Sequence, residues 1–168
     1  SASDVDGDAV TFSASVDGNG SASVDGSTLT VTPATDYNGD ITVTVSASDG
    51  SLAGTDSFTL SVTPVNDAPV VDAIADQVID EDASLTLTLS ASDVDGDALT
   101  FSATSDDTDV VVDGTSLTVT PALDFNGSVS VDVFVSDGSD DYDWVTFILT
   151  ITPVNDAPVL DALSDAAT

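Results

Sequence analysis

Aspartate is the residue type with which this chain could do chemistry. Its 168 residues include 31 acidic side chains and no Lys, Arg or His, so the formal net charge at pH 7 is −31. Only Glu81 is a glutamate. A chain this charged repels itself in any compact state, and it has no internal cation to offset the repulsion. The balancing charge must come from outside, and the short, rigid carboxylates suit a hard cation such as Ca²⁺.

The absent residue types exclude most catalytic chemistry. Without His or Cys the chain has no Ser-His or Cys-His nucleophile and no usual zinc or copper ligand set. We therefore expect no enzyme activity, no catalytic residue and no organic cofactor. Nucleic acid should be repelled, because its binding relies on Lys and Arg at the phosphates. No apolar run has the length that spans a bilayer, so we expect no membrane insertion.

The chain consists of nearly two copies of one unit, offset by 88 or 89 residues. Residues 1–12 (SASDVDGDAVTF) recur at 90–101 (SASDVDGDALTF), and the segment TPVNDAPV occurs at both 63–70 and 152–159. Self-similarity of this kind indicates one structural unit per copy. We expect the following domains: 1–67, a repeat that lacks its first strands; 68–157, a complete repeat; and 158–168, the start of a third repeat or a donated strand.

Apolar and polar residues alternate within each repeat. The clearest stripes are Val129, Val131, Val133 and Val135, followed by Val145, Phe147, Leu149 and Ile151. Alternation that is rich in Val and Thr is typical of half-buried strands. Asp-Gly and Asn-Gly pairs at short spacing predict turns between them. The sequence therefore predicts an all-β fold of tandem antiparallel β-sandwiches and no helix.

Two stretches of the form D-x-D-G-D concentrate the acids. Their members are Asp4, Asp6 and Asp8 in the first copy and Asp93, Asp95 and Asp97 in the second. Ca²⁺ takes about six to eight oxygen ligands at roughly 2.3–2.6 Å, and three carboxylates on one turn supply several of them. A solvated turn is the alternative, since Asp and Gly favour turns. An EF-hand fits less well, because Gly7 and Gly96 occupy the fourth position of the loop and not the sixth.

The order of the acidic motifs in the second copy resembles the cadherin repeat, particularly the cadherin-like tandem repeats of large bacterial surface proteins. The motifs are 80–82 (DED), 91–97 (ASDVDGD), 123–126 (LDFN), 135–138 (VSDG) and 154–158 (VNDAP). In that family an early Glu and the stretches A-x-D-x-D-x-G, L-D-x-E, A-x-D-G and D-x-N-D-N-A-P supply calcium ligands between consecutive domains. The resemblance covers the whole chain and implies Ig-like or cadherin-like sandwiches that bind Ca²⁺.

The resemblance also implies a set of metal ligands for each junction between repeats. The central junction would use Asp36, Asn66, Asp67, Asp93, Asp95 and Asp137. The following junction would use Glu81, Asp124, Asn155 and Asp156, and the preceding one would use Asp4, Asp6 and Asp49. For Asp36, Asp49, Asp124 and Asp137 a plain turn role is the alternative.

The sequence departs from the family pattern in ways that reduce the ligand charge. Asn38 and Asn126 stand where the family has Glu, and Pro64 and Pro153 replace the first Asp of the linker. One or two ions per junction would follow, with Asp8 and Asp97 adding charge to the sites.

Together these features predict a calcium-rigidified structural or adhesive segment of an extracellular bacterial surface protein, whose partners are neighbouring repeats. Two alternatives remain open. One is head-to-tail assembly of like chains by strand exchange. The other is a module that binds a polysaccharide or a cell-surface ligand. Phe134 and Trp144 fall out of phase with the inward stripes, so they pack under a loop, pack on a neighbouring chain or stack on a sugar.

Overall fold

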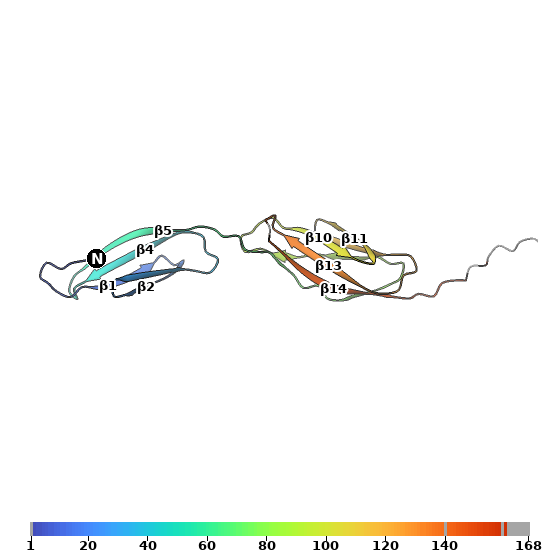
Figure 1. The fold of residues 1–168 in the computed structure, drawn as a ribbon, viewed down its shortest axis with the longest axis horizontal. Helices are drawn as coiled ribbons and strands as arrows, with labels where there is room; N and C mark the ends of the chain where they lie inside the picture. Colours follow the sequence, from blue (N-terminus) through green and yellow to red (C-terminus); the bar gives the residue numbers. More distant parts are fainter. Residues whose placement is uncertain (1, 140, 159, 161–168) are drawn as a thin grey trace, which may run out of the picture. The chain divides into compact units, whose positions relative to one another are not determined.

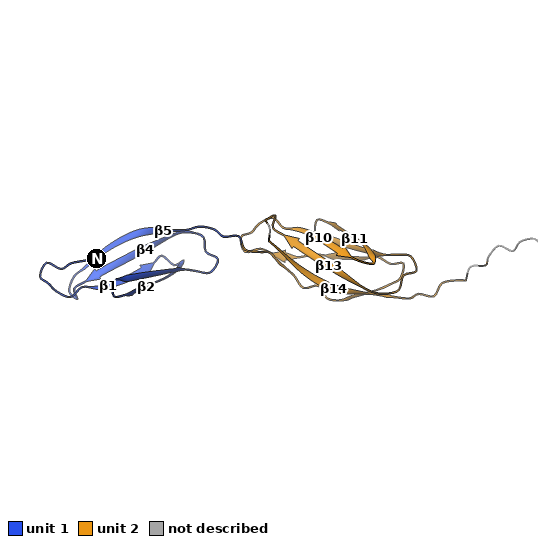
Figure 2. Cartoon of the chain, in the orientation of Figure 1, with its two compact units in different colours: residues 1–66 blue, residues 67–168 orange. Residues whose placement is uncertain are grey.

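The structure, a computed structural model, describes residues 2–139, 141–158 and 160. Chain contacts divide it into two compact units, unit 1 (Ser1–Asn66) and unit 2 (Asp67–Thr168), which Figure 2 shows in different colours. The described residues form β-strands and no helix, which confirms the predicted all-β class. Apart from Pro158 and Leu160, the segment predicted to open a third repeat or to donate a strand lies outside the described residues.

Unit 2 is a sandwich of two main sheets. Its strands, labelled in part in Figure 1, are β6 (Val70–Val71), β7 (Gln77–Asp80), β8 (Leu85–Thr88), β9 (Ala91–Ser92), β10 (Thr100–Ser105), β11 (Thr108–Asp113), β12 (Ser116–Pro121), β13 (Gly127–Ser136) and β14 (Tyr142–Thr152). One sheet has the order β10-β13-β14-β7 and the other β11-β12-β8, while β6 and β9 form a short separate pair. The pairs are antiparallel except β7–β14, which is parallel.

The predicted inward stripes form the core of unit 2. Successive side chains of a strand point to opposite faces, so every second residue of β13 and β14 can face the other sheet. The buried cluster, in which no side chain exceeds 3% exposure, contains Leu89, Leu117, Val119, Val129, Val131, Val133, Phe147, Leu149 and Ile151. Because members come from both main sheets, burial of these apolar residues holds the sheets together.

Asp-Gly pairs close the equivalent hairpins of the two units. Gly114 turns the chain between β11 and β12 with a φ of 60°, and Gly26 does the same in unit 1 with a φ of 58°. This left-handed backbone is accessible to Gly at little cost. The turns place Val112 opposite Leu117 and Val24 opposite Leu29, so the two hairpins share one register.

Unit 1 contains fewer strands. They are β1 (Thr11–Val16), β2 (Gly20–Asp25), β3 (Thr28–Pro33), β4 (Gly39–Ser48) and β5 (Ala53–Val62), in sheets of order β1-β4-β5 and β2-β3. The described part of unit 1 has no counterpart of β6 to β9. As a result β5 lacks the parallel neighbour that β7 gives to β14, and β3 lacks the neighbour that β8 gives to β12.

The missing neighbours leave the core of unit 1 partly open. Ile41 and Val43 are fully buried, but Phe58, which lies opposite Val43 in the ladder, is 47% exposed. Its counterpart in unit 2, Phe147, lies opposite Val131 and is 1% exposed. The same residue type at the same register is therefore buried only where the full set of strands is present.

This difference predicts unequal effects of one substitution. Phe147→Ala should destabilise unit 2 by about 3–5 kcal/mol, because it removes a fully buried ring and leaves a cavity. Phe58→Ala should cost unit 1 less than half as much, because the ring is already half in water. Hydrogen exchange of amides in β4 and in β13 measures the stability of unit 1 and of unit 2 separately. Equal losses of stability in the two units would contradict this account of their cores.

Candidate metal centres

Three carboxylates converge in the loop between β9 and β10. Asp93, Asp95 and Asp97, called here the Asp93 cluster, offer oxygen atoms that all lie within 4.8 Å of one another. Gly96, with a φ of 79°, lets the chain turn back so tightly. The loop is held by two backbone donors: the Asp97 N–H donates to Asp93 Oδ1 at 3.1 Å, and the Asp67 N–H donates to Asp95 Oδ2 at 2.8 Å.

The second oxygen of Asp93 carries the strongest indication of a cation. Asp93 Oδ2 is buried and accepts no hydrogen bond from the described part of the chain. A buried carboxylate oxygen without a partner is costly, and the cost rises when other carboxylates lie beside it. A hard cation coordinated by this oxygen and its neighbours would remove the penalty, so the residues present fit Ca²⁺.

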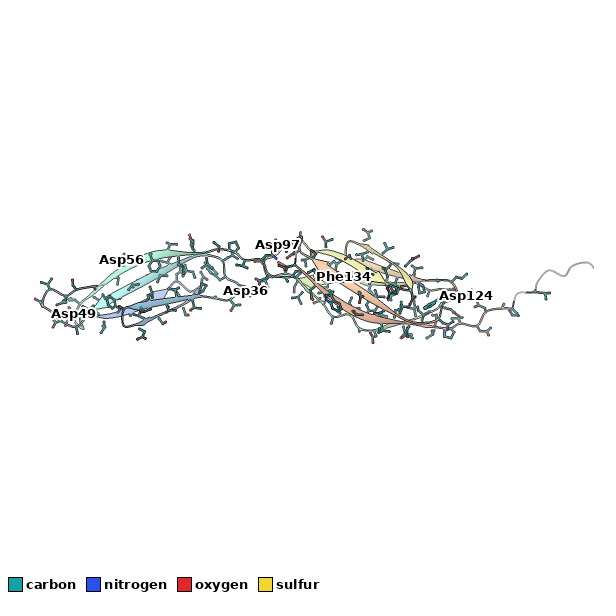
Figure 3. The ribbon with its side chains drawn as sticks, in the orientation of Figure 1. Asp36, Asp49, Asp56, Asp97, Asp124 and Phe134 are labelled. Carbon is teal, nitrogen blue, oxygen red and sulfur yellow. The ribbon has the colours of Figure 1, made fainter. Side chains whose placement is uncertain are left out.

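A second group of acids gathers at the opposite end of unit 2. Asp82 follows β7, Asp124 lies between β12 and β13, and Asp156 follows β14; their oxygens also lie within 4.8 Å of one another. This Asp124 cluster and the Asp93 cluster stand at the two ends of the sandwich, as the positions of Asp124 and Asp97 in Figure 3 show. Unlike the Asp93 cluster, it is assembled from segments far apart in sequence.

Backbone geometry supports the Asp124 cluster as a built feature. Asp82 has a φ of 65° and Asp124 a φ of 58°, a left-handed conformation that non-glycine residues adopt uncommonly and Asp tolerates better than most. The Asp124 N–H donates to Asp82 Oδ1 at 3.1 Å, which ties the two turns together. Such backbone positions tend to occur at functional sites, because the surrounding structure must hold them in place.

Glu81 lies beside this cluster and is 7% exposed. Its Oε1 accepts the Val154 N–H at 2.6 Å, its Oε2 accepts the Asn126 side-chain amide at 3.2 Å, and its own N–H donates to the Thr152 carbonyl at 2.9 Å. Asn126, which stands where the cadherin family has Glu, therefore donates a hydrogen bond to Glu81. Each carboxylate oxygen has capacity for a further partner, since it carries two lone pairs.

Electrostatic repulsion between neighbouring carboxylates affects the pKa of Asp124. Partial desolvation by neighbouring atoms and the negative charges of Asp82, Asp156 and Glu81 raise the pKa of the exposed Asp124 carboxyl above its ordinary value. The chain contains no basic side chain that could compensate. The Asp124 cluster is therefore a place where proton or metal binding relieves strain in the folded state.

The acids of unit 1 at the corresponding positions have local roles. Asp4 Oδ1 accepts the N–H groups of Asp6 and Asp8 at 2.8 and 3.0 Å, and these backbone donors, with Asp8 first, lower the pKa of Asp4. Asp36 has a φ of 56°, close to that of Asp124. No group of three acids among the described residues includes these unit 1 positions. Their predicted role as ligands stays a prediction.

Asp49 and Asp137 shape the turns that follow β4 and β13. Asp49 Oδ1 accepts the N–H groups of Ser51 and Leu52, each at 2.7 Å, and these bonds, that of Leu52 first, lower the pKa of Asp49. Asp137 Oδ1 accepts the Ser139 N–H at 2.8 Å and its hydroxyl at 2.7 Å. The turn interpretation accounts for these contacts, while the ligand role of both residues stays a prediction.

The linker residues and Asp82 complete the comparison with the sequence. Asp67 reaches the Asp93 cluster through its backbone N–H, and Asn155 donates its side-chain amide to the Asp156 carbonyl at 3.2 Å. Asn66 is the last residue of unit 1, and its predicted role as a ligand stays a prediction. Asp82 was not among the predicted ligands, although it directly follows Glu81. The available signal was the run of three acids at residues 80–82 in front of a strand.

The fold is that of an Ig-like repeat protein. Residues 66–152 match the family described as bacterial Ig domain, and residues 1–63 match the cadherin-like domain. The chain therefore belongs to the bacterial Ig domain family and is built of bacterial cadherin-like repeats. Among its described residues there is no helix of the length and hydropathy that a membrane-spanning segment needs.

Individual proteins resemble the chain over most of its length. Chitinase A of Pseudoalteromonas piscicida is 36% identical over 169 residues, which is 95% of this chain and 20% of that protein. The chain thus spans about a fifth of this curated relative. The structure of human protocadherin-24 EC1-2 aligns with a TM-score of 0.54 and 16% identity over 92% of this chain and 85% of the other. The structure of protocadherin gamma B7 domains 1–4 aligns with a TM-score of 0.54 and 17% identity, over 87% of this chain and 42% of the other. These likenesses show the fold.

The raised pKa of Asp124 predicts a pH-dependent effect of Asp124→Asn. Because the folded state binds this proton more readily than the unfolded state, the charged carboxylate destabilises unit 2 at neutral pH. In chelator at pH 7 the variant should therefore be more stable than the parent. The difference should shrink as the pH falls through the raised pKa and vanish below the ordinary value of 3.8. Denaturant unfolding, followed by Trp144 fluorescence at each pH, measures this difference in stability.

Asp36→Asn is the matched control. It removes the same charge at the same backbone conformation in unit 1, and Asn also tolerates the left-handed region. The Trp144 transition should not respond to it. An Asp124→Asn variant that is less stable than the parent in chelator at pH 7 would show that repulsion does not dominate at this cluster.

Proposed function

We propose that the chain is a calcium-stiffened, non-catalytic repeat segment of an extracellular bacterial surface protein, in which it forms part of a stalk or filament body. The observation that carries the proposal is the orphaned, buried Asp93 Oδ2 within a group of three carboxylates. A second carboxylate cluster at the opposite end of the same sandwich supports it. A role without catalysis is typical of the bacterial Ig and cadherin-like families.

Both clusters suit Ca²⁺ better than smaller or softer ions. Every side-chain ligand they offer is a carboxylate oxygen. Ca²⁺ accepts about six to eight oxygen ligands in flexible geometry, whereas Mg²⁺ demands a near-ideal octahedron. Zinc and copper prefer imidazole and thiolate, which the chain lacks. Three carboxylates leave coordination positions open at each cluster. The resemblance to cadherin repeats assigns these to adjoining repeats, and this part of the proposal rests on the sequence alone.

The chain's own residues explain how calcium would stiffen the repeat. Bound Ca²⁺ would supply the positive charge that the carboxylates lack. The Asp93 loop is already tied to the start of unit 2 through the Asp67 N–H, and Asp124 is tied to Asp82. Neutralising the clusters would therefore fix the segments that enter and leave the sandwich. Fixed entry and exit segments are what a stalk of many repeats needs in order to resist bending.

Calcium binding to the whole chain tests this proposal. Differential scanning calorimetry compares the protein in chelator and in Ca²⁺. For one site, the free energy of unfolding should rise by about 2.7 kcal/mol when free Ca²⁺ is 100 times the Kd. The gain should exceed that from NaCl or MgCl₂ at equal ionic strength. A melting temperature that responds only to ionic strength would reject calcium as the ligand.

Asp93→Asn locates the effect. It keeps an acceptor for the Asp97 N–H but replaces the orphaned oxygen with a donor, so one calcium equivalent should disappear from isothermal titration calorimetry. Asp113→Asn is the control, because it removes an exposed acid at the end of β11 that belongs to neither cluster. If both variants bound calcium as the parent does, the Asp93 cluster would not be the site.

A second candidate function is attachment to a polysaccharide. Two large aromatic side chains of unit 2, Tyr142 and Trp144, are 62% and 56% exposed, which a purely structural repeat does not require. The relative named Chitinase A contains a segment similar to almost the whole chain within a much longer protein. A repeat that accompanies a polysaccharide-degrading enzyme could both space its domains and hold the substrate nearby. The two functions are compatible, because the aromatic residues belong to neither acidic cluster.

A further inference from the structure

Phe134, Tyr142 and Trp144 form one exposed surface on unit 2, called here the aromatic face. All three lie on the side of β13 and β14 that points away from the core, because the alternating residues Val133, Val135 and Val145 occupy the inward positions. Phe134 lies directly opposite Trp144 in the ladder. The Phe134 and Tyr142 rings approach with centroids 6.5 Å apart.

The aromatic face is open rather than covered. Trp144 is 56% and Tyr142 62% exposed, while Phe134 is half-buried between them and strand β10. Ile148, on the same side of β14, is 39% exposed. Of the three alternatives for Trp144, this exposure excludes packing under a described loop and leaves a neighbouring chain or a sugar. Exposed aromatic surface carries a cost in solubility and is usually retained for binding.

Unit 1 shows that the fold does not need these rings. At the corresponding positions it carries Ser46, Ala53 and Thr55. Ser46 lies opposite Thr55 in the β4–β5 ladder just as Phe134 lies opposite Trp144 in β13–β14. The same strand pair with the same register therefore forms from small polar residues. The rings are an addition to one copy of the repeat, which points to a ligand.

We propose that the aromatic face binds a neutral polysaccharide chain, an inference that rests on the second proposed function and assigns its site. Aromatic faces stack on the apolar C–H faces of pyranose rings. The next row of the sheet supplies polar groups for sugar hydroxyls: Asp132 lies opposite Thr146, and the Thr146 hydroxyl donates to Asp132 Oδ1. The site thus offers both kinds of contact that sugars use.

Charge selects the class of ligand. Asp132 lies in the row beside Phe134 and Trp144, and the chain as a whole carries −31 with no basic side chain. Sulfated and uronic polysaccharides would be repelled, as would anionic lipid surfaces. Nucleic acid also stacks on aromatic rings, but its binding needs a positively charged groove along the backbone, which this sequence cannot form. An uncharged glycan meets no such penalty.

Ring geometry selects the form of the ligand. The planes of Phe134 and Tyr142 are inclined at 56° to each other. Two rings inclined in this way cannot both lie flat on one planar surface, such as the face of a crystalline polymer. They can follow successive residues of a single glycan chain that twists along its axis. The aromatic face therefore fits soluble or amorphous chains.

Isothermal titration of the whole chain with soluble neutral glycans tests the site. The probes are hydroxyethyl cellulose, xylan and N-acetylchitohexaose, with alginate as the anionic comparison. The key variant replaces the rings with their unit 1 counterparts: Phe134→Ser, Tyr142→Ala and Trp144→Thr. Unit 1 forms its ladder with these residues, so the variant should keep its circular dichroism spectrum. Ile148→Thr is the matched control on the same side of the sheet.

We expect the parent and Ile148→Thr to bind at least one neutral probe with the same affinity, and the triple variant to bind about tenfold more weakly or not at all. Binding by the parent that survives unchanged in the triple variant would overturn the site while leaving the second function in place. No binding of any neutral probe by the parent would overturn the second function itself. Preference for alginate would overturn the assignment of a neutral ligand.

Discussion

The absence of any basic side chain is the constraint on which the structure depends. Each buried or clustered carboxylate must find its partner among backbone N–H groups, neutral side chains or external cations, because no internal salt bridge is available. The chain uses the first two where it can: backbone donors hold Asp4 and Asp49, and an amide and an N–H hold Glu81. Two places lack sufficient partners of these kinds. Asp93 Oδ2 is buried without a hydrogen bond from the described residues, and Asp124 is surrounded by other carboxylates. These two places are the proposed cation sites, and they lie at the two ends of the sandwich.

The internal repeat lets each structural effect be compared within one molecule. Phe58 and Phe147 occupy the same register, and their very different burial isolates the contribution of the strands before β10. Asp36 and Asp124 share a left-handed backbone, so what distinguishes them is the surrounding acids. The aromatic face likewise separates residues that build the sandwich from residues added to it. One copy therefore serves as a reference for the other.

Features that depend on neighbours in sequence could be predicted. The alternation of Val129 to Val135 indicated the buried strand, and Asp25-Gly26 and Asp113-Gly114 indicated the hairpins, because strand period and turn chemistry are local. The Asp93 cluster could also be predicted, since its members lie within five residues. Non-local features could not be read in this way: the parallel pairing of β7 with β14 and the meeting of Asp82 with Asp156 both depend on the tertiary fold. The exposure of Trp144 could not be predicted for the same reason. Its position out of phase with the inward stripe does not indicate which part of the fold covers it.

A crystal of the whole chain grown in millimolar calcium, with anomalous diffraction measured to locate the metal, tests the central claim most directly. The account predicts an anomalous peak about 2.3–2.6 Å from Asp93 Oδ2, shared with Asp95 or Asp97. A map with no peak there, and with Asp93 Oδ2 hydrogen-bonded to ordered water instead, would contradict it.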